Sequence, residues 1–272
     1  MERGNLERHE IFLSGLHVGV RSSCARTNRY LRRHWAGAKQ PIVRPEATCE
    51  IEVIADRTPR IVVDGEVLWS DGVAEDLVAG FEQWLYRLAL ARHKRRFVVF
   101  HAAALVSDGR TVVFSGPSGA GKSSLALAAV RRGWKYFSDE FVVTDGKRVW
   151  GWPRAIRFDP PKPGSRRPEY LQHLDLDDDA VESPKDAAPY YAVAGASIQR
   201  TTCLARQAHF VGVERAAKTT LAPVPATVGL KYWTEASFFR PAISLGSLVG
   251  ANRVWRASWR RPNELIEMIE AT

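Results

Sequence analysis

The chain has few cysteines, and none stands in a metal-binding or redox pattern. Three are present among 272 residues, Cys24, Cys49 and Cys203, and no CxxC spacing occurs. This scattered, odd-numbered set excludes a structural zinc knuckle and predicts a reducing, cytoplasmic location. The simplest interpretation of all three is that they are small, buried, apolar side chains.

Long apolar runs are also missing. No stretch of about 18 uninterrupted apolar residues occurs, which argues against a transmembrane helix and a membrane partner. The N-terminal MERGNLERHEIF carries three glutamates and no apolar core, so it does not have the pattern of a secretory signal. With 45% hydrophobic and 25% charged residues, the composition is that of a globular protein of one large or two small domains.

Positive charge is plentiful, but it is not gathered into one stripe. The net charge of +9 favours anionic partners such as nucleotides, phosphates or acidic peptides. RHKRR at 92–96 comes where a predicted helix ends, and cations there offset the helix dipole. RVWRASWRR at 253–261 alternates Trp and Arg, which fits either base stacking with phosphate contact or a solvated strand with one aromatic face. We expect the strand, and therefore no nucleic-acid partner.

Local patterns predict a β-rich N-terminal portion, residues 1–94, with one packing helix. Residues 50–69 read as β structure, and Asp64-Gly65 is a two-residue hairpin signal between two short strands. Residues 74–93 change to a helical period with acidic residues in the first turn.

Residues 95–272 predict a single α/β domain. Apolar strands alternate with turns and two helices, and Gly133 and Pro262 mark the end of one helix and the start of the other. The expected elements are strands at 97–106 and 111–116, a helix at about 122–132, a strand, Asp-Gly turn and strand over 134–153, strands at 208–214 and 253–259, and a helix at 262–271.

An irregular segment, residues 159–190, interrupts this domain with six prolines and a cluster of acids. Segments of this length within compact domains are typically lids, binding loops or disordered. DLDDD at 175–179 lacks the glycine turn and final glutamate of a calcium loop, so a solvated loop or helix start is the better interpretation.

The strongest motif is GPSGAGKS at 116–123, a complete match to GxxxxGK[ST], the Walker A pattern. It follows an apolar strand and precedes a helix-forming run, so backbone N–H groups and the helix dipole would both face a polyphosphate. Lys122 would reach the β- and γ-phosphates and Ser123 would hold Mg²⁺. The predicted nucleotide-binding residues are Gly116, Pro117, Ser118, Gly119, Ala120, Gly121, Lys122, Ser123 and Ser124.

Two acids and a histidine flank this loop. Asp139 and Glu140 come at the next strand, where an acid can reach the metal ion, so both are candidate metal ligands with Ser123. Because side chains alternate along a strand, both point to the site only near a strand end or a bulge; otherwise Glu140 faces away as a solvated or salt-bridged residue. His101 lies in the strand before the loop strand, and taken alone it is a core residue.

The arrangement of His101, the loop and Asp139-Glu140 resembles HPr kinase/phosphorylase and its relatives. Those proteins have a histidine in the strand before the loop, a GxSGxGKS loop and an acidic doublet at the next strand, and the spacings agree. The resemblance covers about residues 95–145. It implies a P-loop kinase domain of the HPr kinase/phosphoenolpyruvate carboxykinase type, with a mixed sheet rather than the parallel sheet of most P-loop enzymes.

The same resemblance implies catalytic roles. Asp139 would be the base that accepts the acceptor's proton, Glu140 would assist the metal or the base, and His101 would orient the acidic pair near the γ-phosphate. The cofactors would be ATP and Mg²⁺, and Lys122 would stabilise charge on the transferred group. The acceptor would be a hydroxyl, expected to be serine, on a peptide or small protein.

The chain departs from that family after Trp150. The Glu-x-Arg-Gly signature tied to HPr capture and phosphorolysis is replaced by WPRAIRFDPP, which puts HPr itself and the reverse reaction in doubt. Arg154 and Arg157 in this replacement could neutralise phosphate charge, or could be solvent-exposed arginines. Two alternatives to the peptide kinase stay open, a P-loop ATPase or nucleotide switch and a small-molecule kinase. Homo-oligomerisation is also left open.

Overall fold

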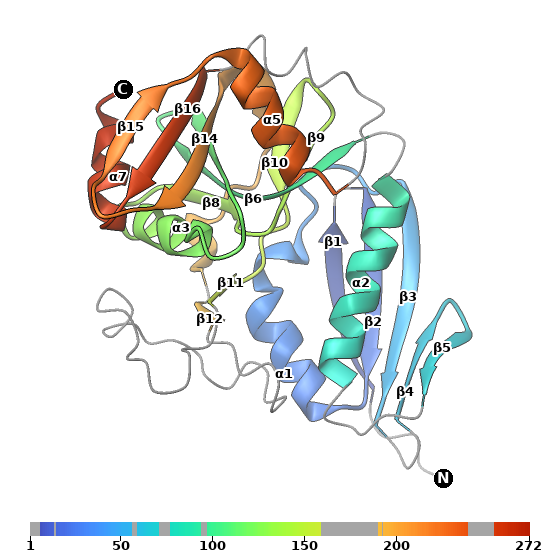
Figure 1. The fold of residues 1–272 in the computed structure, drawn as a ribbon. Helices are drawn as coiled ribbons and strands as arrows, with labels where there is room; N and C mark the ends of the chain where they lie inside the picture. Colours follow the sequence, from blue (N-terminus) through green and yellow to red (C-terminus); the bar gives the residue numbers. More distant parts are fainter. Residues whose placement is uncertain are drawn as a thin grey trace. The chain divides into compact units, whose positions relative to one another are not determined.

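A computed structural model of the chain describes residues 6–13, 15–55, 59–70, 77–93, 97–158, 190–191, 193–238 and 253–272 (Figure 1). The chain divides into two compact units. Unit 1 comprises residues 1–89 and 157–192, and unit 2 comprises 90–156 and 193–272. Within the described ranges, no helix has the length and apolar character that crossing a membrane requires.

Unit 1 is built on a five-stranded sheet in the order β1-β2-β3-β4-β5, in which only β2 and β3 pair in parallel. Every second residue of β3 is buried, the pattern of a sheet that is covered on one face. Its elements are β1 (Glu7–Leu13), β2 (Leu16–Ser22), α1 (Ala25–His34), η1 (Ala36–Lys39), β3 (Ala47–Ile54), β4 (Arg60–Val63), β5 (Glu66–Ser70) and α2 (Leu77–His93), whose last turn belongs to unit 2.

The two helices of unit 1 contact each other and the sheet. The Tyr30 hydroxyl on α1 donates to Glu82 Oε1 on α2 at 2.6 Å. A Cβ at Gly80 of α2 would lie 3.2 Å from Ile61 of β4, so this helix packs closely on the sheet. The Asp64-Gly65 hairpin is confirmed, with both residues at positive φ. The helix α1 was not expected from the sequence.

Unit 2 is built on a nine-stranded mixed sheet in the order β13-β10-β9-β6-β7-β14-β16-β15, with β8 also paired to β6. The strands β7, β14 and β16 run parallel, whereas the pairings β6–β7, β6–β8, β6–β9, β9–β10, β10–β13 and β15–β16 are antiparallel. The prediction of a mixed sheet is confirmed.

The elements of unit 2 are β6 (Val98–Ser107), β7 (Arg110–Ser115), α3 (Lys122–Arg131), β8 (Lys135–Ser138), β9 (Phe141–Thr144), β10 (Arg148–Gly151), η3 (Gly195–Ser197), β13 (Cys203–Leu204), η4 (Ala205–Gln207), β14 (Ala208–Arg215), β15 (Thr220–Pro223), α5 (Ala226–Ala236), β16 (Arg253–Trp259) and α7 (Pro262–Glu270). A separate two-stranded sheet consists of β11 (Ile156–Arg157) and β12 (Tyr190–Tyr191).

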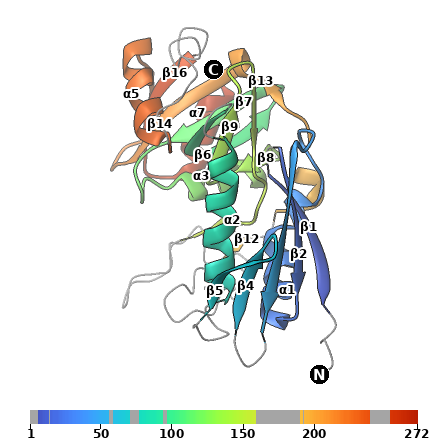
Figure 2. The same cartoon turned by 90° about the vertical axis from the view of Figure 1, so that its right-hand side faces the viewer.

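Helices cover both faces of this sheet (Figure 2). Because side chains alternate along a strand, Gly212 of β14 and its neighbour Val254 of β16 face α5, whereas Val213 and Trp259 face the opposite side, towards the start of α3. The helix α7 packs beside α3 and on β15 and β16.

Two expectations about elements need correction. The strand predicted from Trp134 is two strands, β8 and β9, separated at Asp139-Glu140. The strand 253–259 is not an exposed strand, because β16 is paired on both sides, with β14 and β15. The irregular segment 159–190 lies outside the described residues except for its last residue, as do the basic residues 94–96, so the expectations about both stay predictions.

Candidate active site

The GPSGAGKS segment forms a loop between the end of β7 and the start of α3. The strand β7 lies between β6 and β14, so the loop leaves the sheet from a central strand. Gly119 and Gly121 have φ values of +79° and +86°, which L side chains rarely adopt, so glycine allows the turn into the helix. The helix therefore points its N-terminal, positive dipole end at the loop, the geometry that binds phosphate.

Lys122 occupies the inside of this loop. Its ammonium donates to the carbonyl oxygens of Gly116 at 2.9 Å and Pro117 at 3.2 Å, and the residue is 7% exposed. An ammonium held there would meet the terminal phosphates of a nucleotide. Ser123 is half-buried in the first turn of α3, and Ser124 is buried.

Trp259 supports the loop from the neighbouring strand β16. Its indole Nε1 donates to Ala120 O at 3.0 Å, and a Cβ at Gly121 would collide with its ring. The Arg215 guanidinium lies 4.8 Å from the centroid of the same indole ring. Trp259 was not predicted as a site residue, because the alternation of Trp and Arg in its strand was interpreted as a surface feature. The unusual aromatic content of the strand was the signal in the sequence.

The acidic pair lies in the break between β8 and β9. Ser138 Oγ accepts hydrogen bonds from the backbone N–H groups of Glu140 at 3.2 Å and Phe141 at 3.0 Å, which fixes the bend. The Glu140 carbonyl in turn accepts from Ala102 N at 3.2 Å on β6. The sequence pattern predicts that both acids reach the site only near a strand end or a bulge. Asp139 and Glu140 do lie at a strand end, between β8 and β9.

Asp139 is buried, with 5% of its surface exposed. The Tyr136 hydroxyl donates to Asp139 Oδ1 at 3.1 Å. Burial of Tyr136, together with the negative charge of Asp139, raises the pKa of this tyrosine well above its usual value. The phenol therefore stays protonated and can serve only as a donor to the carboxylate.

Glu140 forms an ion pair with Arg154, whose side chain is almost entirely buried. This is the salt-bridged arrangement that the sequence left open for Glu140, and it means that Arg154 is not a solvent-exposed arginine. Arg157 lies on β11, in the part of the chain that belongs to unit 1.

His101 lies on β6 and is half-buried. Burial lowers its pKa below the usual range; the charges of Lys122 and Arg154 lower it further, and that of Glu140 raises it. The imidazole is therefore neutral at neutral pH. The structure thus brings together the loop, the histidine and the acidic pair that the sequence singled out, and adds Tyr136, Arg154 and Trp259.

The residues present fit a nucleotide with Mg²⁺. Magnesium commonly takes few protein ligands and relies on phosphate and water oxygens for the rest. Ser123 and Asp139 remain candidate ligands, whereas Glu140 is already paired with Arg154. Among the described residues, no group of three or more His, Cys, Asp or Glu side chains forms a preassembled metal site.

Comparison with solved structures finds distant structural similarity only. No family model matches the chain, and no curated protein matches it. Among solved structures, the chain is similar to the HPr(Ser) kinase/phosphatase from Coxiella burnetii, at 17% identity and a TM-score of 0.29, over 64% of this chain and 91% of that one. A similarity of this extent assigns neither family nor activity. The function therefore has to be inferred from the residues of the site.

Proposed function

We propose that this chain is an ATP-dependent kinase that transfers the γ-phosphoryl group to a hydroxyl of a peptide or small protein, with serine the expected acceptor. The observation that carries the proposal is the Lys122 ammonium inside the phosphate loop, together with the buried carboxylate of Asp139 in the same unit. The mixed sheet and the motif resemblance support a kinase domain of the HPr kinase/phosphoenolpyruvate carboxykinase type. The scattered cysteines favour a location in the cytoplasm.

In the proposed reaction, the acceptor oxygen attacks the γ-phosphorus. A new O–P bond forms, the bond between the γ-phosphorus and the β,γ-bridging oxygen breaks, and ADP leaves. Asp139 accepts the hydroxyl proton, and the hydrogen bond from Tyr136 fixes the orientation of its carboxylate. Lys122 and the loop N–H groups stabilise the charge on the phosphates.

The other groups have supporting roles. Mg²⁺ would supply neutralisation of phosphate charge, with Ser123 as its protein ligand, while Asp139 takes the proton. The neutral His101 can donate a hydrogen bond without adding charge. Arg154 holds Glu140 by their ion pair, so Glu140 assists indirectly.

The first test is nucleotide binding. ATP with Mg²⁺ at about 100 times its Kd stabilises the folded chain by roughly 2.7 kcal/mol. At about 2–4 °C per kcal/mol for a chain of this size, the melting temperature rises by several degrees. Lys122→Ala should remove most of this shift, whereas Lys147→Ala, at an exposed turn of the same unit, should retain it. An equal shift in all three proteins would exclude the loop as the site.

The second test separates a kinase from an ATPase. ADP release is measured by an enzyme-coupled assay, and the fate of the phosphoryl group is followed with γ-labelled ATP, both with and without a pool of serine-containing peptides. We expect slow release alone, faster release with peptides, and label in the peptide fraction. Rapid hydrolysis that peptides do not change would replace the kinase with an ATPase or nucleotide switch.

A further inference from the structure

A cleft of about 940 Å³ opens beside the phosphate loop. One end is formed by His101 and by the first residues of the loop, Gly116 to Ser118. The other wall is one face of α5 together with residues of β14 and β16. That wall comprises Thr227, Val228, Lys231, Tyr232, Glu235 and Ala236 of α5, with Glu214 and Arg256 of the strands.

The cleft faces the γ-phosphate end of the loop. The Lys122 ammonium, which contacts the β- and γ-phosphates in this motif, donates to the carbonyls of Gly116 and Pro117. These same two residues line the cleft. A molecule in the cleft would therefore meet the terminal phosphate, which is the position of an acceptor rather than of the nucleoside.

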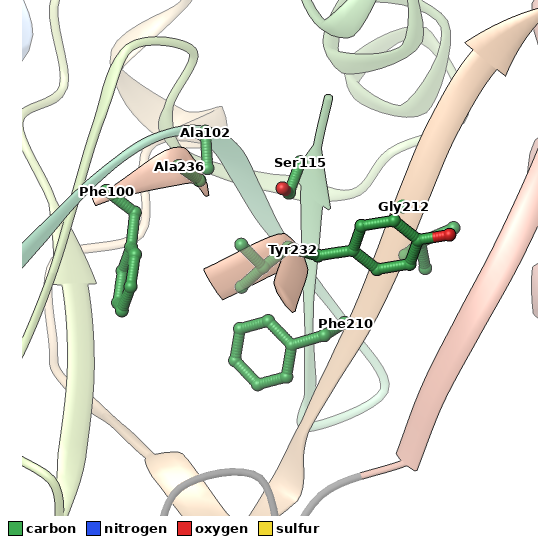
Figure 3. A pocket seen from close by; sticks show the side chains of 9 residues that line it. Phe100, Ala102, Ser115, Phe210, Gly212, Tyr232 and Ala236 are labelled. Atoms are coloured by element: carbon green, nitrogen blue, oxygen red, sulfur yellow. The ribbon is translucent and has the colours of Figure 1, made fainter. Parts of the chain in front are cut away.

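The α5 wall is held firmly against the sheet. The ring of Tyr232 lies across Gly212, where a Cβ would come within 2.6 Å of it (Figure 3), and a Cβ at Gly229 would come within 2.7 Å of Val254. Phe100, Phe210 and Tyr232 line an apolar cavity of only about 10 Å³ between the helix and the sheet, so little space remains in this interface. The helix end is tied to β6 by Phe238 N, which donates to Val99 O at 3.1 Å.

The charges on the wall are balanced in pairs. Lys231 lies 3.8 Å from Glu235, and Arg256 lies 3.0 Å from Glu214, all four at the exposed rim. An anionic small acceptor such as a sugar phosphate would require cations without carboxylate partners. Exposed pairs of this kind contribute little and can exchange partners, so the rim suits an occupant that carries charges of both signs. Val228 and Tyr232 add apolar surface between the pairs.

We infer that this cleft is the acceptor subsite, and that it binds a peptide segment with side chains of mixed charge beside the reacting hydroxyl. The inference rests on the proposed kinase function. The wall positions the peptide and takes no part in proton transfer.

The test compares two matched variants. Thr227→Arg places a long side chain in the cleft, whereas Ala226→Arg makes the same addition at the neighbouring exposed position, which is not among the described residues that line it. The probes are a degenerate library with one fixed serine and γ-labelled ATP. We expect Thr227→Arg to lower labelling at least tenfold, with Ala226→Arg close to wild type. Both should keep the MgATP-dependent melting shift.

Specificity gives a second readout that misfolding cannot imitate. The double variant Lys231→Glu/Glu235→Lys keeps the ion pair but reverses its direction. Sequencing of the labelled library should then show altered charge preferences near the serine.

Several outcomes would overturn the inference. Labelling of Thr227→Arg equal to wild type, or unchanged preferences in the double variant, would place the acceptor elsewhere. Loss of the MgATP shift in Thr227→Arg would assign the cleft to the nucleoside. Wild-type labelling of small anionic alcohols but of no peptide would overturn the acceptor class. If wild-type protein shows no MgATP shift at all, the kinase proposal itself fails.

Discussion

At the scale of single residues, the site depends on polar groups that are buried and at the same time hydrogen-bonded or ion-paired. Asp139, Lys122 and Arg154 each have at most 7% of their surface exposed. Burying a charge is costly unless partners compensate it, and here the partners are Tyr136, the loop carbonyls and Glu140. Such groups are candidates for function because a fold that needed only stability would place apolar side chains there.

Asp139→Asn tests the base directly. The amide keeps the shape of the carboxylate but cannot accept the acceptor's proton, and a positioned base contributes about 10²–10⁴-fold. We expect turnover to fall on the order of a hundredfold or more, while the MgATP melting shift is largely kept. Asp108→Asn, the same change in an exposed turn, is the control. Wild-type turnover in Asp139→Asn would assign the base to another residue.

Trp259→Phe tests the support of the phosphate loop. The change removes the indole donor to Ala120 and part of the surface against Gly121. Trp134→Phe is a close match, because Trp134 is also buried and its Nε1 donates to Glu270 Oε1 at 2.9 Å, but it does not contact the loop.

Both Trp variants should lose stability through a lost hydrogen bond and a smaller core side chain. Only Trp259→Phe should also weaken MgATP binding, by about tenfold, which corresponds to about 1.4 kcal/mol. Calorimetric titration measures the Kd of each, and denaturant unfolding measures their stability. Equal Kd values in the two variants would show that Trp259 is only a core residue.

His101 gives a prediction about pH. Burial lowers its pKa in the folded chain, so on acidification the unfolded chain binds this proton first. The stability contribution is present above the unfolded pKa near 6.5 and is lost as pH falls through the lower folded value. Between pH 7.5 and 5.5, the free energy of unfolding measured with denaturant should therefore fall less in His101→Gln than in wild type. An identical loss would mean that another group dominates, such as His209, whose pKa is also lowered by burial.

At the scale of elements, the sequence pattern predicted those helices and strands whose ends are set by local turn and cap residues. The β6–β7 hairpin, α3 with Gly133 beyond its end, β14 and α7 with Pro262 in its first turn were all expected, because each has its own turn or cap signal. The break between β8 and β9 was missed, since WKYFSDEFVV is continuously strand-like apart from its two acids. That break is made by Ser138 hydrogen bonds and by the pairing of β6 with both strands, which no local pattern encodes.

The same limit applies to β16 and α1. The alternation of Trp and Arg in β16 fits an exposed strand, but the strand lies inside the sheet and its Trp259 is buried against the phosphate loop, whereas Arg256 is exposed. Helix α1 is rich in arginine and has few apolar residues, and its buried face includes Tyr30 and Leu31, which pack within unit 1. Tertiary contacts outweighed local propensity in both cases. The motif residues were identifiable from the sequence, but Tyr136 and Trp259, which hold them, were not.

At the scale of the whole molecule, the described residues of the proposed site all belong to unit 2, although unit 2 is assembled from two separate stretches of the chain. The phosphate loop comes from the first stretch, whereas Trp259, α5 and the strand residues at the cleft rim come from the second. Nucleotide binding should therefore stabilise unit 2 across both stretches. Amide hydrogen exchange in the β1–β5 sheet of unit 1 should stay as it is without nucleotide.

Hydrogen exchange read by mass spectrometry tests this distribution. MgATP at about 100 times its Kd should slow exchange by about a hundredfold in amides whose opening destroys the site, since 2.7 kcal/mol is about two factors of ten. The slowing should appear in peptides from β7 and α3 and also in those from β14 and β16, because Trp259 couples the two stretches. Lys122→Ala should abolish it in both. Protection confined to 112–131 would disprove that coupling, and equal protection of β1–β5 would show that unit 1 takes part in nucleotide binding.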